Sequence, residues 1–180
     1  MAKEHGLVGP FPEGADPDGY DRARRRILWS MPTGLFVLGS VHDGRRNLMT
    51  LNWAVQVATD PKIVAVSVEA EAVTNALVRD GGVFSLNILS REDRAIVRKF
   101  VKPLADDGEP SQLAGFEMVT ATTGAPILAV AAAWLDCEVR NALDLGSHTL
   151  FTGEVVNCGG DVDDGTEILR MEDTRMSYGG

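Results

Sequence analysis

The sequence predicts a mainly β protein in which antiparallel strands form a closed or split barrel, with only a few short helices. Strand-like segments with alternating or β-branched residues recur along most of the chain. No long regular alternation of strand and helix appears, which argues against a βαβ sheet. At 180 residues, with 44% hydrophobic and 24% charged residues, the chain has the size and composition of one soluble globular domain.

We divide the chain into an N-terminal arm and helix over residues 1–30 and a barrel domain over residues 31–180. The first 17 residues are rich in glycine and proline, which predicts an arm that needs other contacts to become ordered. Asp18 and Asp21 can cap a helix that runs to Ser30. Its arginines are expected to form a solvated face, with a subunit contact or a cofactor phosphate as the alternative: Arg22, Arg24, Arg25 and Arg26.

The next predicted elements are a buried strand over residues 34–41 and a tight turn at residues 42–45, which read His-Asp-Gly-Arg. The strand that follows, over residues 47–53, alternates Thr50 and Asn52 with larger side chains. One face of this strand is therefore small and polar.

A further strand is predicted for residues 62–68, a β-branched run with Ser67 near its end. Together the two strands would present small hydroxyl and amide groups beside exposed backbone, which suits a flat ligand with hydrogen-bonding edges. A half-solvated hairpin without a ligand is the alternative.

The remaining elements follow from the same periodicities and from turn residues. They are a short helix stopped by Gly81 and Gly82, a strand over 83–89, a helix from 90 to 101 opened by a capping sequence, a polar loop over 102–114 that serves as a lid or a surface excursion, strands over 129–140 and 147–156, and an edge strand over 167–169. One face of the strand over 129–140 is small and apolar, which suits barrel packing or a subunit contact.

Charge and motifs exclude several functions. With 26 acidic against 17 basic residues, the formal charge of −9 argues against a general nucleic-acid or anionic-membrane surface. The sequence has no dinucleotide-binding glycine motif, phosphate loop or Gly-x-Ser-x-Gly elbow. The histidines, His5, His42 and His148, are too scattered to predict a metal site.

We also expect a cytoplasmic protein. The sequence shows neither a signal peptide nor an apolar run long enough to span a bilayer. Cys137 and Cys158 lack metal-ligand spacing and are expected to be reduced and structural.

Two blocks of motifs carry a specific resemblance. The first block contains Met-Pro-Thr-Gly-Leu-Phe-Val at 31–37, Asp-Gly at 43–44, Asn-x-Met-Thr-x-Asn-Trp at 47–53 and Asp-Pro-Lys at 60–62. The second contains Gly-Ala-Pro-Ile-Leu at 124–128, Trp-Leu-Asp-Cys-Glu-Val at 134–139 and Asp-x-Gly-x-His-Thr-Leu-Phe at 144–151. In their order and spacing these motifs resemble the flavin reductase-like family of FMN-binding split barrels.

This resemblance implies an antiparallel Greek-key split β-barrel that forms a homodimer with its two flavin sites at the subunit interface. It implies reduction of FMN, or of FAD, by NADH or NADPH, with a flavin-dependent monooxygenase as a candidate partner. A non-catalytic flavin or haem carrier on the same scaffold is the alternative function.

The resemblance places the flavin along the central strands and the passage from strand to helix that follows them. The residues assigned to the flavin are Asn47, Met49, Thr50, Leu51, Asn52, Trp53, Ser67, Val68, Glu69, Val73 and Thr74. Trp53 lies on the strand face opposite Asn52, so we expect it in the core in preference to a stacking position on the ring.

For the flavin phosphate, the resembling family commonly uses a basic side chain and a hydroxyl. Thr74 supplies the hydroxyl, but Glu69 and Glu71 stand where Lys or Arg is often found, and two carboxylates would repel a phosphate unless they point away. We expect Arg98 or Lys99 to supply the positive charge.

The motif Asp144-x-Gly146-x-His148-Thr149 assigns His148 to the nicotinamide side of the site, as the catalytic residue, by resemblance to related reductases. A histidine at the start of a strand, just after a glycine-containing turn, lies at a barrel rim where a second ligand can enter. The alternative is a rim histidine that hydrogen-bonds a neighbouring loop.

Overall fold

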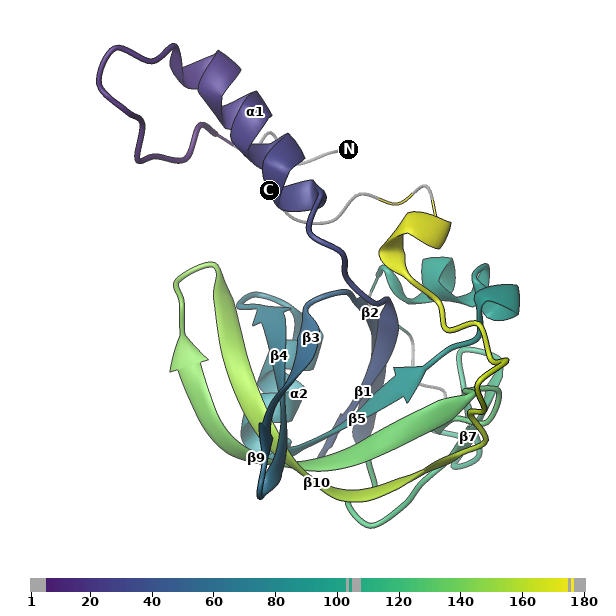
Figure 1. Ribbon diagram of the computed structural model, residues 1–180. Coiled ribbons are helices and arrows are strands. Elements are labelled where there is room, and N and C mark those ends of the chain that lie inside the picture. The colour runs from purple at the N-terminus through teal and green to yellow at the C-terminus, as the bar shows by residue number, and fades with distance from the viewer. Residues whose placement is uncertain (1–5, 103, 105–107, 175, 177–180) are drawn as a thin grey trace.

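The computed structural model describes residues 6–102, 104, 108–174 and 176, which form a seven-stranded antiparallel sheet with a three-stranded sheet beside it (Figure 1). The large sheet has the order β2-β1-β5-β9-β10-β4-β3. Its strands are β1 (Phe36–His42), β2 (Arg45–Leu51), β3 (Ala54–Thr59), β4 (Lys62–Glu69), β5 (Val83–Ile88), β9 (Ala133–Asp144) and β10 (His148–Gly160). The small sheet contains β6 (Gln112–Leu113), β7 (Phe116–Val119) and β8 (Ile127–Leu128).

The large sheet curls into a barrel that is split between β2 and β3. All six neighbouring pairs in the strand order are antiparallel. The edge strands β2 and β3 share no ladder in the part of the chain that the structure describes, and Asn52 and Trp53 link one to the other. The predicted fold class, an antiparallel split barrel with few helices, is confirmed.

Two turn residues, Asp43 and Gly44, form the tight hairpin between β1 and β2. Asp43 and Gly44 adopt φ angles of 47° and 75°, the left-handed conformation that a two-residue hairpin turn requires, and His42 pairs with Arg45 across it. The predicted turn at residues 42–45 is therefore confirmed.

The apolar residues form two cores, one on each face of β1 and β2. The barrel interior is filled by side chains such as Val66, Phe84 and Phe151. The other core lies outside the barrel wall, where Leu48 packs with Phe100. Alternation along β2 sends successive side chains to opposite cores, so both faces of this strand are covered.

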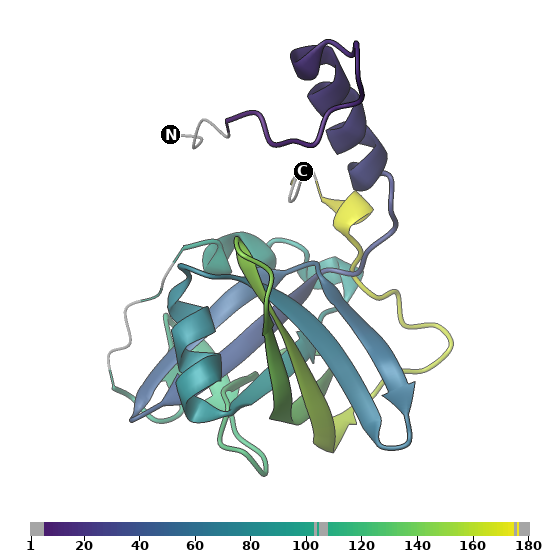
Figure 2. The same ribbon diagram turned by 90° about the vertical axis from the view of Figure 1, so that its left-hand side faces the viewer.

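Of the two α-helices in the described residues, α2 (Val73–Gly81) packs against the barrel, and α1 (Pro17–Trp29) projects away from it (Figures 1 and 2). The N-cap of α1 is Asp16, whose carboxylate accepts from the Gly19 amide, and not Asp18 as predicted, because Pro17 and Asp18 already lie in the first turn. The predicted stop of α2 is confirmed: Gly82, with a φ of 68°, is its left-handed C-cap.

The helix predicted from 90 to 101 is wrong. Two 3₁₀ helices replace it, η1 (Arg91–Asp93) and η2 (Ile96–Phe100). Side chains three apart are eclipsed in a 3₁₀ helix, so both Val97 and Phe100 can enter the outer core. Ser90 does cap η1 by accepting from the Glu92 amide, as its sequence predicts.

Two strand predictions also need correction. The strand predicted over 129–140 begins only at Ala133, because the preceding residues turn, with the Ala131 amide bonded to the Leu128 carbonyl. The predicted edge strand over 167–169 is reduced to two isolated bridges, Gly34 with Arg170 and Ser90 with Ile168.

The loop predicted over 102–114 lies partly outside the described residues. Its described part is held to β2 by Arg46, which donates to the carbonyls of Glu109, Pro110 and Gln112 at 2.9, 2.9 and 3.0 Å. Near its other end, the Leu104 amide donates to Asn47 Oδ1 of β2 at 3.2 Å, so both ends of the loop contact the strand that carries predicted flavin residues.

Candidate functional site

A pocket of about 270 Å³ opens where β2, the end of β4 and the start of α2 meet the residues that follow η2. Five of the residues predicted to bind flavin line it: Asn47, Met49, Glu69, Val73 and Thr74. Leu48, Glu71, Ala72, Phe100, Val101 and Lys102 complete the lining. The structure therefore brings together three separate stretches of the chain, residues 47–49, 69–74 and 100–102.

Asn47 is the polar centre of this pocket. Its side chain is almost fully buried, and its Nδ2 donates to Thr74 Oγ1 at 2.8 Å, while its Oδ1 accepts from the Leu104 amide at 3.2 Å. One amide thus links β2, the first turn of α2 and the loop after η2. Because a buried amide needs partners for both its donor and its acceptor, this position strongly favours asparagine.

The first turn of α2 forms one wall. Ala72 is its N-cap and makes no side-chain hydrogen bond, and Ala72, Val73 and Thr74 all line the pocket. The pocket therefore faces the positive end of a helix, where free amide groups favour an anionic ligand group.

Charged side chains occupy the rim. Glu69 and Glu71 are exposed on one side, and Lys102 is the basic residue among the described lining residues. Arg98 and Lys99 do not line the pocket, because η2 turns Val97 and Phe100 inward and leaves these two side chains exposed. Of these three basic residues, the structure therefore places only Lys102 at the pocket.

The residues that follow Met49 on β2 point elsewhere. The Thr50 hydroxyl is buried and donates to the Val97 carbonyl at 2.5 Å, so it secures η2 and does not face the pocket. Leu51 belongs to the barrel interior, and Asn52 is buried where the chain leaves β2. Trp53 is 38% exposed, so the expected core position is wrong.

Trp53 instead contacts His148 at the rim of the barrel. The two ring centroids are 4.9 Å apart with the planes inclined by 60°, an edge-to-face arrangement. His148 starts β10, pairs in register with Glu69 on β4, and has its Nδ1 3.0 Å from the Ser147 hydroxyl. Partial burial lowers the pKa of His148, and the nearby Glu69 opposes this shift.

Ser67 and Val68 support this rim from β4. The Ser67 amide donates to the Trp53 carbonyl at 3.0 Å, which fixes the link between the edge strands. Val68 is fully buried, and its carbonyl accepts from Asn75 of α2. Glu69, the next residue, lines the pocket and also faces His148. The pocket and the His148–Trp53 pair are therefore neighbours on one strand end.

Sequence reasoning missed Lys102 and the wall formed by Ala72 and Phe100. No motif marks Lys102, because its place depends on where η2 ends. A larger cavity, of about 690 Å³, lies between residues 29–34 and the C-terminal segment, and none of the predicted flavin residues lines it. The described residues contain no group of three or more side chains that could hold a metal ion.

Comparison with known families matches residues 28–179 to the flavin reductase like domain. The chain belongs to the flavin reductase-like family. None of its described helices is both long and apolar enough to cross a membrane.

Several relatives of this flavin reductase-like chain carry informative names. The NADH-dependent flavin reductase StyB of Pseudomonas fluorescens is 33% identical over 136 residues, covering 75% of this chain and 76% of StyB. The NADH-dependent FAD reductase of Streptomyces globisporus is 30% identical over 155 residues, covering 83% of this chain and 81% of that protein. Two other curated relatives are longer, and the chain spans 24% and 56% of their lengths.

A solved structure has the same fold. The Streptomyces globisporus NADH:FAD oxidoreductase SgcE6, in complex with NAD and FAD fragments, superposes with a TM-score of 0.72 at 25% identity. The superposition covers 87% of this chain and 90% of SgcE6.

The residues of the pocket fit part of a flavin. The Asn47 amide and the Thr74 hydroxyl offer both donors and acceptors, and the start of α2 offers a positive electrostatic end. Val73 and Phe100 add apolar surface. This combination suits a ligand that has an apolar ring, hydroxyl groups and an anionic end.

Proposed function

We propose that this chain binds a flavin and reduces it with a nicotinamide nucleotide. The observation that carries the proposal is the adjacency of the Asn47–Thr74 pocket and the His148–Trp53 pair at the end of β4, in a member of the flavin reductase-like family. A bound flavin supplies the redox chemistry, because it accepts a hydride and carries both electrons away in reduced form.

In this proposal Asn47, Thr74 and the first turn of α2 hold the polar part of the flavin, and Lys102 neutralises its phosphate. Charge-assisted hydrogen bonds to a phosphate are stronger than neutral ones. Lys102 should therefore contribute more to phosphate binding than the neutral donors of the pocket. The pocket of about 270 Å³ leaves little room for the additional adenosine half of FAD. We therefore propose FMN as the flavin, with FAD as the alternative that the binding experiment below distinguishes.

We assign the nicotinamide nucleotide to the side of His148 and Trp53. The lowered pKa of His148 keeps its imidazole neutral at neutral pH, so it can exchange hydrogen bonds with an amide without adding charge. Glu69 lies opposite and disfavours the extra phosphate of NADPH. NADH is the donor we propose, and the names of the two relatives described above support this choice.

We further propose a homodimer. The outer face of the sheet carries Leu143 of β9 and Leu150 of β10, which pair with each other, and Val55 of β3, which pairs with Ala65, two residues before the Leu150 partner Ser67 on β4. Val55 is 62% exposed and Leu143 57% exposed. An apolar strip of this kind at the side of a ligand site is typical of a subunit contact.

From the family resemblance we propose that a flavin-dependent monooxygenase in the cytoplasm uses the reduced flavin. Cys137 and Cys158 are both free thiols, which agrees with a reducing compartment.

Anaerobic mixing of the flavin-loaded chain with each nicotinamide in a stopped-flow spectrophotometer tests the proposal. We expect the oxidised flavin band to bleach, faster with NADH than with NADPH, and we expect FMN to bind more tightly than FAD in a preceding titration. A chain that binds flavin but leaves it oxidised at all donor concentrations is a carrier, and the enzymatic proposal is then wrong.

A further inference from the structure

Thr50 is a buried polar residue of β2 that lies outside the pocket. Its hydroxyl donates to the Val97 carbonyl of η2 at 2.5 Å, and its side chain is not among the groups that line the pocket. The hydrogen bond therefore joins the strand that forms one wall of the pocket to a 3₁₀ helix.

The helix η2 leads directly into the pocket. Phe100, its last residue, lines the pocket together with Val101 and Lys102, which follow it. Val97 and Phe100 are also fully buried in the outer core beside Leu48. The place of Lys102 therefore depends on how η2 is fixed to β2.

Two hydrogen bonds to β2 bracket Lys102 along the chain. Before it, the Val97 carbonyl accepts from Thr50, and after it, the Leu104 amide donates to Asn47 Oδ1 at 3.2 Å. Residues 97 and 104 are thus both tied to one strand, and Lys102 lies between them. Of the two anchors, only Asn47 also lines the pocket.

A lysine needs such anchoring more than most phosphate ligands do. Its ammonium group is a point charge at the end of a flexible stem, so much conformational freedom is lost when it is held against an anion. A backbone that is fixed before the ligand arrives lowers this cost. Any change that frees η2 should therefore weaken the contact between Lys102 and a phosphate.

We propose that Thr50 is a positioning residue for the flavin phosphate, because it fixes η2 and so holds Lys102 at the pocket. The inference rests on the proposed flavin site and on the assignment of Lys102 to the phosphate. It requires that Thr50 affect the phosphate end of the ligand and not its ring. A purely structural role would instead affect every flavin equally.

Fluorescence titration with FMN and with riboflavin, which lacks the phosphate, separates these roles. We define the phosphate preference as the affinity for FMN divided by that for riboflavin. Thr50→Val keeps the branched shape but removes the hydroxyl, and it should lower the phosphate preference about threefold. Thr50→Ser keeps the donor and should retain the wild-type preference. Equal losses for both ligands in Thr50→Val would overturn the inference.

Ser85→Ala is the matched control. The Ser85 hydroxyl is also buried and also donates to a carbonyl, that of Pro126 at 2.5 Å, but it lies on β5 and does not line the pocket. This variant should lose stability in urea and keep the wild-type phosphate preference. A preference that falls as far as in Thr50→Val would show that any buried hydroxyl has this effect, and the inference would then be wrong.

A double-mutant cycle tests whether Thr50 acts through Lys102. Thr50→Val should lower the phosphate preference in the wild-type background and leave it unchanged in a Lys102→Met background, because the contact that it positions is then absent. The same loss in both backgrounds would overturn the inference alone. A chain that binds neither FMN nor riboflavin would overturn the proposed function as well.

A second measurement needs no flavin. In a Cys158→Ser background, a spin label is attached to Lys102→Cys, since Cys137 is buried and does not react. The label should be more mobile with Thr50→Val than with Thr50 or Thr50→Ser, and equal mobility in all three would contradict the positioning role. Circular dichroism verifies the fold, and Thr50→Ala replaces Thr50→Val in both measurements if the valine variant does not fold.

Discussion

Lys102 is the residue that gives the proposed flavin site its positive charge. Its side chain lines the pocket with Asn47 and Thr74, whereas the neighbouring Lys99 is exposed outside it. Lys102→Met should therefore weaken FMN binding about tenfold, the loss of roughly 1.4 kcal/mol that one charge-assisted hydrogen bond supplies, and leave riboflavin binding unchanged. Fluorescence titration with both ligands measures this, and Lys99→Met is the matched control. Equal losses for FMN and riboflavin would point to an altered fold.

Substitution of His148 tests where the nicotinamide nucleotide is proposed to bind. His148→Ala should leave FMN affinity nearly intact and lower kcat/KM for NADH about tenfold, because the donor loses its proposed contact beside Trp53. If the imidazole only helps binding, the defect should disappear at saturating NADH; if it orients the donor, the defect should remain. Reduction at the wild-type rate at every NADH concentration would remove His148 from the site.

At the scale of elements, the sequence predicts turns and helix ends that depend on residue type, but it does not predict whether a helical segment is α or 3₁₀. Asp43-Gly44 and Gly82 each need a positive φ, so their turn and helix stop follow from residue type. Residues 90–101 have a good capping sequence and helical spacing, yet they form two 3₁₀ turns, because only packing against Leu48 decides how Val97 and Phe100 point.

The same dependence on packing decides which residues of the pocket could be predicted from the sequence. The periodicity of β2 and α2 and their order along the chain are predictable from the sequence. The structure brings Asn47, Met49 and Thr74 of these elements together, as the resemblance implies. Trp53 was placed on the wrong side, because a strand pattern continued through residue 53 although β2 ends at Leu51. Lys102 could not be found, since its position depends on η2.

Close packing between elements leads to a prediction for β1. A Cβ at Gly39 would meet the Pro126 carbonyl and the Ser85 hydroxyl, which are themselves hydrogen-bonded at 2.5 Å. Gly39→Ala should therefore lower the free energy of unfolding by about 1–3 kcal/mol, measured by urea denaturation. Gly165→Ala, whose Cβ would be 3.4 Å from its nearest neighbour, is the control and should change stability by less than about 0.5 kcal/mol. Equal stability of the two variants would contradict this account of β1.

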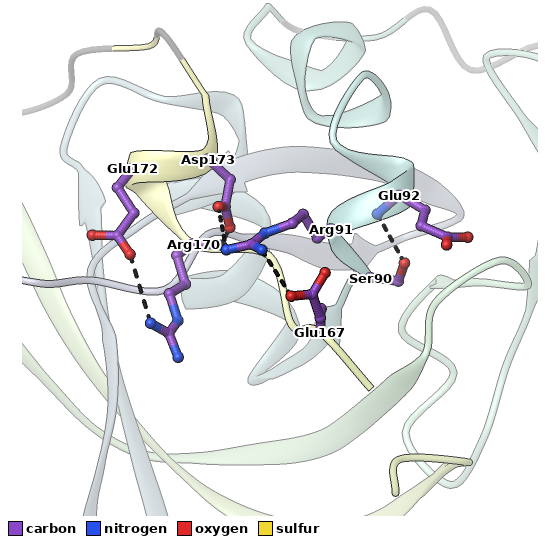
Figure 3. A network of polar contacts seen from close by, with 7 residues as sticks. All are labelled: Ser90, Arg91, Glu92, Glu167, Arg170, Glu172 and Asp173. Carbon is purple, nitrogen blue, oxygen red and sulfur yellow. Dashed lines mark hydrogen bonds and ion pairs between the residues drawn. The ribbon is translucent and has the colours of Figure 1, made fainter. Parts of the chain in front are cut away.

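At the scale of the whole molecule, a polar network ties the C-terminal segment to η1, which follows β5 (Figure 3). Arg91 of η1 binds Glu167 at 2.9 Å and Asp173 at 2.8 Å, so it reaches residues about eighty positions away in sequence. Asp173 also accepts from the Arg170 amide at 2.9 Å. The hydrogen bond from Arg91 is the main cause that lowers the pKa of Asp173 below its ordinary value of 3.8.

This network predicts how acid affects stability. A carboxyl group whose pKa is lower in the folded chain stabilises it above the ordinary value, and that contribution is lost as the pH falls through the folded pKa. Asp173→Asn should therefore reduce the urea midpoint at pH 7, and the difference from wild type should shrink as the pH drops below 3.8. Glu172→Gln, at an exposed ion pair 3.6 Å long, is the control and should have little effect. A difference that is constant with pH would rule out this role for Asp173.

Burial in the barrel raises the pKa of the Cys137 thiol to about 12, whereas Cys158 on β10 is exposed. Reduced flavin released in air reacts with oxygen to form hydrogen peroxide, so a chain with the proposed activity works beside an oxidant of its own making. Peroxide attacks the thiolate, and a thiol that stays protonated and out of solvent resists it. Oxidative damage should thus fall on the surface sulfur, while the sulfur that helps to fill the barrel outlasts many turnovers.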